Sequence, residues 1–137
     1  MSTANKDTLE VVNPYSLEVI GSLQRIDWED IDTMLERAAS LHQDRTSWLP
    51  AFKRIEILKK TAVLMESRFE ELAFQIADEG GKPLIDARVE VTRAIDGIGL
   101  CIHEIAQITG KEIPMDLTAA GAGRIAFTQR EPIGPMV

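Results

Sequence analysis

The sequence predicts a mainly α-helical fold with a β-hairpin near the N-terminus and a strand near the C-terminus. Two short apolar segments flank a turn within residues 9–24, which predicts the hairpin. Amphipathic runs with helix start and stop signals fill residues 27–110. Strand-like alternation then returns, and we expect strands over residues 124–137. At 137 residues the chain has room for one domain, so we predict a single domain over residues 1–137.

The hairpin prediction depends on the turn "NPYS", which lies between "LEVV" and "LEVIGSL". Asn13-Pro14 is a good turn opener, because proline fixes φ and asparagine can bond its own backbone. A two-stranded hairpin alone is marginal in water, so we expect it to lie against another element.

The first helix is predicted to start after Asp27, a natural N-cap with Asp30 in the capping-box position. Ile26 and Ile31 have the spacing of a hydrophobic staple around this cap. Apolar residues then recur at helical spacing, and we expect this helix to end near Trp48.

A long apolar seam follows Pro50, with steps of four and three residues in alternation. Such a seam is compatible with a coiled coil or with two successive core helices. The second capping box "SRFE", at residues 67–70, favours two helices. Gly80 or Gly81 is expected to close the second of them, and Pro83 to start the next helix.

The last predicted helix is expected to be stopped by Gly110. Its expected buried face is formed by Ala87, Val91, Ala94, Ile98, Ile102 and Ile105. Gly97 and Gly99 lie inside it, where each costs about 1 kcal/mol relative to alanine. We therefore expect another element to pack closely there.

Composition excludes several classes of protein. Apolar residues make up 45% and charged residues 27%, as in ordinary soluble domains. The net charge of −7 argues against nucleic acid and anionic membranes as partners. The N-terminal "MSTANKDTLE" has no apolar run, so we expect no signal peptide. The single cysteine cannot form an internal disulfide, which favours a cytoplasmic location.

Residues with catalytic potential are few. "GAGRIA" (121–126) has the letters of a dinucleotide fingerprint, but strand-like residues follow it where a helix is required. Cys101 is predicted to be a buried structural thiol, because apolar residues flank it within a helix. His103 points about 200° away from it, so the two form no dyad. We therefore expect no catalytic, cofactor-binding or metal-ligating residue in this chain.

The order of motifs resembles the start of the NAD(P)-dependent aldehyde dehydrogenase superfamily. "VVNPYSLEVIGSL" is similar to the opening N-P-x-[TS]-x-E-x-[IL]-G hairpin of that family, and "DIDTMLERAASLHQDRTSW" is similar to its first helix. The segment from "RIEILKK" to "DARVEV" resembles its R-x-x-[IL]-L…E-x-GKP…A…E-V stretch. "GKEIP" and "REPIGPMV" resemble the tract before its catalytic half.

The resemblance implies an α/β parent enzyme that oxidises a small aldehyde, anionic or neutral, to its acid through a cysteine thiohemiacetal. NAD or NADP would be the cofactor of that parent, and a homo-oligomer is implied because the "RIAFTQRE" strand resembles the arm that joins subunits. In the family the oxyanion-hole asparagine, the general-base glutamate and the nucleophilic cysteine all follow "REPIG". We therefore expect an amino-terminal fragment, inactive alone, with no bound cofactor.

Two residues stand out by this resemblance. Val89 and Arg93 share a helix face and match positions at the mouth of the family's substrate tunnel. A guanidinium there could hold a carboxylate, phosphate or phosphonate on a short aldehyde. The alternative is that Arg93 is a plain surface charge or pairs with Glu90 or Asp96.

A second class of function stays open. The chain could be a stand-alone helical interaction module derived from that fold, with exposed apolar faces as its partner surface. In both cases we expect self-association, because these faces would remain exposed.

Overall fold

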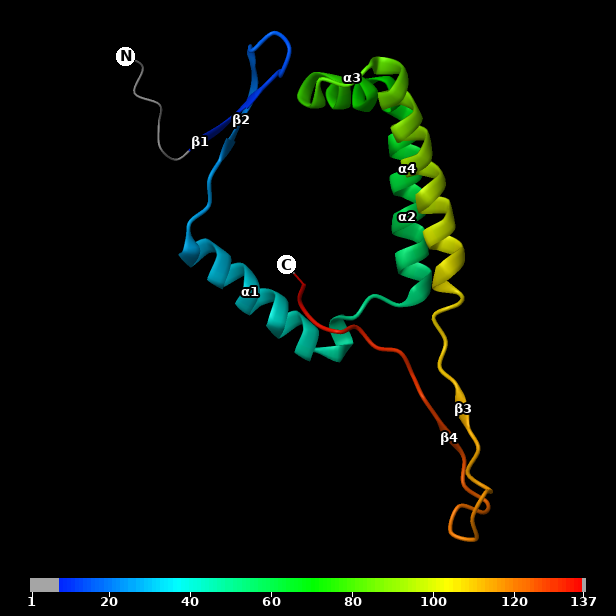
Figure 1. The fold of residues 1–137 in the computed structure, drawn as a ribbon. Helices are drawn as coiled ribbons and strands as arrows, with labels where there is room; N and C mark the ends of the chain where they lie inside the picture. The colour runs from blue at the N-terminus through cyan, green and yellow to red at the C-terminus, as the bar shows by residue number, and fades with distance from the viewer. Residues whose placement is uncertain (1–7, 137) are drawn as a thin grey trace.

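The computed structural model describes residues 8–136, which form four α-helices, one short 3₁₀ helix and two two-stranded antiparallel sheets (Figure 1). The mainly helical fold with strands at both ends confirms the predicted fold class. The elements in chain order are β1 (Thr8–Val12), β2 (Val19–Gln24), α1 (Trp28–Gln43), the 3₁₀ helix η1 (Arg45–Ser47), α2 (Ala51–Ser67), α3 (Phe69–Gly80), α4 (Leu84–Ile105), β3 (Glu112–Ile113) and β4 (Ala126–Phe127).

The N-terminal hairpin forms as predicted, with β1 and β2 antiparallel and a register shift after Val11. The Asn13 side chain shapes the turn, because its Oδ1 accepts the backbone N–H groups of Tyr15 at 2.9 Å and Ser16 at 3.0 Å. Asn13 also reaches the helices, since its Nδ2 donates to Oδ1 of Asp78 on α3 at 2.9 Å. The hairpin therefore contacts another element through its turn, whereas the strand residues other than Val11 are exposed.

Helix α1 starts where the sequence predicts but ends earlier. Oδ1 of Asp27 accepts the backbone N–H of Asp30 at 2.9 Å, which confirms the N-cap. The expected end near Trp48 is wrong, because the helix stops at Gln43. The Asp44 carboxylate accepts from the backbone N–H and the hydroxyl of Thr46, at 3.0 and 2.6 Å. These local bonds replace helical ones and start η1.

The seam after Pro50 divides into α2 and α3, as predicted, but for a different reason. The second capping box is wrong: the Ser67 hydroxyl donates back to the carbonyl of Leu64 at 2.8 Å, and Arg68 occupies the cap position without a side-chain bond. Gly81 closes α3 with a φ of 62°, in the left-handed region, as expected for a glycine cap.

The core lies between α3 and α4. Among residues 8–136, the fully buried apolar side chains are Ala73 on α3 and Ala87 and Val91 on α4. Two alanines at the contact let the helix axes approach closely. At the edge of this contact, Nη2 of Arg88 lies 2.9 Å from Oε2 of Glu70. The partly buried residues around this core are Phe69, Leu72, Ile76, Ala77, Leu84 and Ile95.

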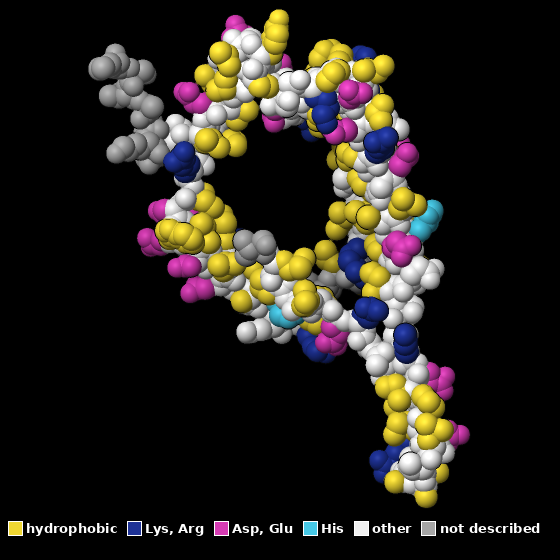
Figure 2. All heavy atoms as spheres, viewed as in Figure 1, with side chains coloured by type: hydrophobic (Ala, Val, Ile, Leu, Met, Phe, Trp, Pro, Cys, Tyr) yellow, Lys and Arg dark blue, Asp and Glu magenta, His cyan; other side chains and the backbone are white. Residues whose placement is uncertain are grey.

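The rest of the described chain is open. Helix α4 runs alongside α2, whereas α1 lies across an opening from them (Figures 1 and 2). The accessible surface is 11721 Å². A compact monomer of 15.2 kDa exposes roughly 7,100 Å². Much apolar surface therefore has no cover among the described residues.

The expected helical range 27–110 and strand range 124–137 are both too long. Helix α4 ends at Ile105, not at Gly110. A Cβ at Gly110 would lie 1.5 Å from the carbonyl oxygen of Thr128, so this glycine permits close approach of two backbones. Only Ala126–Phe127 pairs as a strand there, with Glu112–Ile113, and residues 128–136 form no further strand. Val137 lies outside the described residues.

The expected close packing at Gly97 and Gly99 is also wrong for the described residues. A Cβ built at either position would meet nothing within 4 Å. Ala94, predicted on the buried face of the same helix, is exposed. The fully buried residues of α4 therefore lie in its first half, whereas Ile98, Ile102 and Ile105 of the predicted face are half-buried.

Candidate substrate-entrance site

The structure brings Val89 and Arg93 together on α4, one turn apart, beside a cavity of about 350 Å³. Lys82, Asp86 and Glu90 complete its lining. Ala87 lies two positions before Val89, and Val91 lies two positions before Arg93. Both Ala87 and Val91 are buried against α3. Because neighbours two apart point about 200° away from each other on a helix, Val89 and Arg93 face away from the core.

The cavity carries two cations and two carboxylates. Nζ of Lys82 forms an ion pair with Oε1 of Glu90. The Arg93 side chain forms no ion pair and no hydrogen bond within residues 8–136, and neither does the Asp96 side chain. The alternative pairing of Arg93 with Glu90 or Asp96 is therefore absent, whereas the exposure of Arg93 also agrees with the alternative of a plain surface charge. A free guanidinium beside an apolar valine is suited to an anion on a short carbon chain.

The local sequence explains how Lys82 comes to this cavity. The left-handed Gly81 turns the chain out of α3, and Pro83 is the N-cap of α4. Lys82 therefore lies in a turn whose backbone is fixed on both sides. A Cβ at Gly81 would lie 2.6 Å from Cγ of Pro14, which shows that the hairpin turn seats against this corner.

The remaining chemical candidates do not form sites. Cys101 is exposed, so the predicted buried thiol is wrong. The half-buried apolar residues around it on α4 are Ile98, Ile102 and Ile105, and the thiol lies outside the covered part of this face. Residues 8–136 contain no group of three or more potential metal ligands, and none of their helices is long and apolar enough to cross a membrane.

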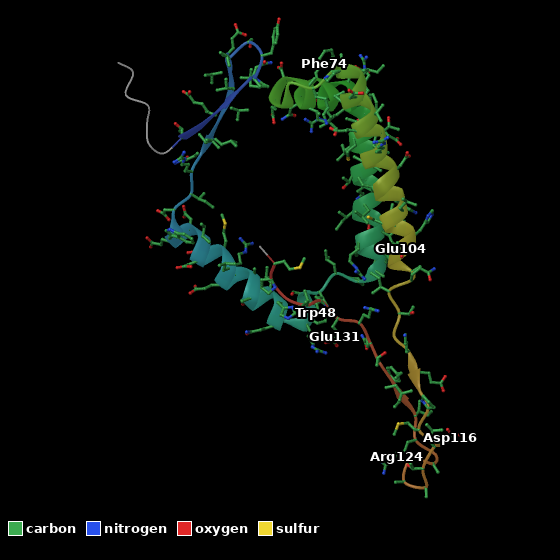
Figure 3. All side chains as sticks on the ribbon, in the orientation of Figure 1. Trp48, Phe74, Glu104, Asp116, Arg124 and Glu131 are labelled. Carbon is green, nitrogen blue, oxygen red and sulfur yellow. The ribbon has the colours of Figure 1, made fainter. Side chains whose placement is uncertain are left out.

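The "GAGRIA" stretch lies in the loop between β3 and β4, at the end of an extended arm (Figure 3). Arg124 lies near its tip, and β4 begins two residues later, at Ala126. A dinucleotide fingerprint needs a helix N-terminus at that point to face the pyrophosphate. This stretch therefore does not fit a nucleotide.

A larger cavity of about 660 Å³ was not predicted. It lies where residues 129–135 cross the end of α1, close to Trp48 and Glu131 (Figure 3). Nε1 of Trp48 donates to the carbonyl of His42 at 3.0 Å, and Nη2 of Arg45 lies 2.6 Å from Oε2 of Glu131. Arg45 and Glu131 are 86 residues apart in the chain, so no local sequence pattern predicts their ion pair.

The comparison with known families decides the identity of the fold. Residues 1–137 match the model of the aldehyde dehydrogenase family. The chain belongs to the aldehyde dehydrogenase family. This confirms the resemblance that its motifs carry.

Individual relatives of this aldehyde dehydrogenase family member cover nearly all of the chain. A lactaldehyde dehydrogenase of Methanocaldococcus jannaschii is 35% identical over 130 residues, which are 95% of this chain and 27% of that protein. A sulfoacetaldehyde dehydrogenase of Neptuniibacter caesariensis is 30% identical over 133 residues, which are 96% of this chain and 28% of that protein. The chain thus spans about a quarter of the length of these relatives.

Solved aldehyde dehydrogenases share the fold. The chain is similar to aldehyde dehydrogenase 21 from Physcomitrella patens in complex with succinate, with a TM-score of 0.78 and 32% identity over 89% of this chain and 25% of that one. An NADP-dependent glyceraldehyde-3-phosphate dehydrogenase from Bacillus halodurans, complexed with NADP, gives a TM-score of 0.81 and 26% identity over 93% of this chain and 27% of that one. The fold of the described residues is therefore that of the corresponding part of these enzymes.

Proposed function

We propose that this chain supplies the amino-terminal part of an NAD(P)-dependent aldehyde dehydrogenase that oxidises a small anionic aldehyde to its acid. The observation that carries the substrate class is the free guanidinium of Arg93 beside Val89 at the α4 cavity. Arg93 would hold the anionic group, and Val89 would contact the carbon chain.

Several relatives support an anionic substrate. Their names include sulfoacetaldehyde, 3-sulfolactaldehyde and aspartate-semialdehyde dehydrogenase, at 29–30% identity. The aldehyde dehydrogenase 21 structure holds succinate, a dicarboxylate. The lactaldehyde dehydrogenase at 35% identity takes an uncharged aldehyde by its name, so the charge preference needs a direct test.

The covalent chemistry is assigned to the whole enzyme. A cysteine thiolate would add to the aldehyde carbonyl to form a thiohemiacetal, and loss of a hydride from that carbon would leave a thioester. Water would then hydrolyse the thioester, which releases the acid and the thiol. NAD or NADP would accept that hydride when bound, and the "GAGRIA" stretch of this chain does not fit a nucleotide. The chain alone is expected to show no turnover. A cytoplasmic homo-oligomer remains our prediction for the whole enzyme.

The test is an Arg93→Ala substitution in the full-length enzyme, assayed with 4-oxobutanoate and with its uncharged analogue butanal. We expect kcat/KM for 4-oxobutanoate to fall at least about tenfold, on the scale of one lost charge-assisted bond, while butanal turnover changes less than about twofold. Arg88→Ala is the matched control, because it removes the same charge from α4 but faces Glu70. Equal losses of kcat/KM with the two aldehydes would show that Arg93 does not distinguish a charged aldehyde from an uncharged one.

A further inference from the structure

The ion pair between Lys82 and Glu90 has little to contribute to stability. The two side chains are 36% and 47% exposed, and ion pairs this open contribute little because water screens them. The effect of this ion pair is local, because it makes Lys82 the partner of the Glu90 carboxylate. Lys82 reaches Glu90 from the turn before α4, eight residues earlier in the chain.

Glu90 has a competing partner on its own helix. Residues three apart on a helix are neighbours, so Glu90 and Arg93 are at pairing distance by their spacing. That pairing is absent in the structure, where Glu90 is held by Lys82 and Arg93 is free within residues 8–136. The other charge at the cavity, Asp86, is also a carboxylate. Without Lys82, Arg93 would be the only cation among two acids.

We propose that Lys82 is a positioning residue for substrate specificity, which holds Glu90 away from Arg93 and so keeps the guanidinium free for the anionic group of the aldehyde. This inference rests on the proposed function of Arg93. It adds that three residues set the preference for an anionic aldehyde. Lys82 holds Glu90, and Glu90 therefore leaves Arg93 free. Lys82 acts through Glu90 and does not touch the substrate itself.

The test is a set of variants of the full-length enzyme, assayed with 4-oxobutanoate and butanal. We expect Lys82→Met to raise KM for 4-oxobutanoate about three- to tenfold, the scale of one Coulomb interaction between partly exposed charges, with kcat and butanal kinetics unchanged. Adding Glu90→Gln to Lys82→Met should restore KM to within about twofold. The double variant also shows that loss of Lys82 leaves the enzyme folded.

Two further variants isolate the path of the effect. Lys53→Met removes the same charge and breaks a lysine–glutamate pair on α2, with Nζ 3.1 Å from Oε2 of Glu56, and should leave the KM for both aldehydes unchanged. In the Arg93→Ala background, Lys82→Met should have no further effect on KM, because its effect passes through Arg93.

The outcomes separate this inference from the proposed function. If Arg93→Ala selectively impairs 4-oxobutanoate but Lys82→Met does not, the inference fails and the anion role of Arg93 stands. If Glu90→Gln fails to rescue Lys82→Met, Lys82 acts directly or structurally and the inference is overturned. If Arg93→Ala affects both aldehydes equally, the proposed anion role fails and this inference falls with it.

Discussion

Helix α1 and the α3–α4 pair have equally regular apolar patterns but very different burial. All the fully buried apolar side chains of residues 8–136 lie on α3 and α4. Helix α1 has none, and its Met34 and Leu41 are 57% and 51% exposed. Helical periodicity predicts which face of a helix is apolar, whereas burial depends on a partner that the pattern does not encode.

The contacts that α1 does make are polar and aromatic. At its end, the His42 and Trp48 rings stack with centroids 5.7 Å apart, and the Arg45 guanidinium lies 5.2 Å from the Trp48 ring centre. Arg45 also holds Glu131, so the segment after β4 is tied to the end of α1. One end of α1 is therefore anchored, while most of its apolar face stays exposed among the described residues.

The strongest test of this contrast places an aspartate in each region. Val91→Asp should destabilise the chain by at least about 3 kcal/mol, because it buries a carboxylate without a partner. Met34→Asp should cost less than about 1 kcal/mol, because Met34 is largely exposed. Thermal or urea unfolding followed by far-ultraviolet circular dichroism would measure both. A large loss for Met34→Asp would mean that another molecule covers the α1 face in solution.

Local signals account for most of what the sequence predicts correctly about the fold. The Asp27 cap, the turn at Asn13 and the left-handed Gly81 depend on bonds or dihedral angles within a few residues. The errors come from alternatives that such rules also allow. The Asp44 carboxylate ends α1 early, and Gly110 serves a backbone contact with Thr128, 18 residues away in the chain.

The candidate site was predictable only in part. Spacing alone places Val89 and Arg93 on one face, and the cavity contains both. The partner of Glu90 was not predictable, because Lys82 reaches it from outside the helix through the turn at Gly81. The burial of Cys101 was predicted wrongly because its apolar neighbours in sequence do not show whether another element covers the thiol. The exposed apolar face of α1 has the same explanation.

The next test breaks the contact between the hairpin and the helices. Gly81→Ala should destabilise the chain by about 1–2 kcal/mol from the left-handed φ alone, and by more if Pro14 cannot move away from the new methyl group. Gly80→Ala is the matched control, because a Cβ there meets nothing within 4 Å and alanine favours the helix by up to about 1 kcal/mol.

Unfolding midpoints of the two variants measure the difference. Hydrogen exchange at the Leu17 amide, which donates to the Asn13 carbonyl at 2.9 Å, reports whether the hairpin turn loosens with Gly81→Ala. If both glycine variants behave alike, the corner at Gly81 does not hold the hairpin against the helices.

The smallest expected effect concerns the acid sensitivity of α2. Hydrogen bonds from Lys60 and then Lys53 lower the pKa of Glu56 below its ordinary value of 4.5. A carboxylate whose pKa is lower in the folded state contributes stability above its unfolded pKa, and loses it as pH falls through the folded pKa. Glu56→Gln should therefore lower the unfolding temperature slightly at pH 7 and by less as the pH falls toward about 3. Glu66→Gln is the matched control, because Glu66 lies on the same helix and its side chain forms no ion pair among the described residues. A Glu56→Gln loss of equal size at both pH values would mean that the Glu56 side chain acts through packing. The two lysine pairs would then add no stability to α2, just as the exposed apolar face adds none to α1.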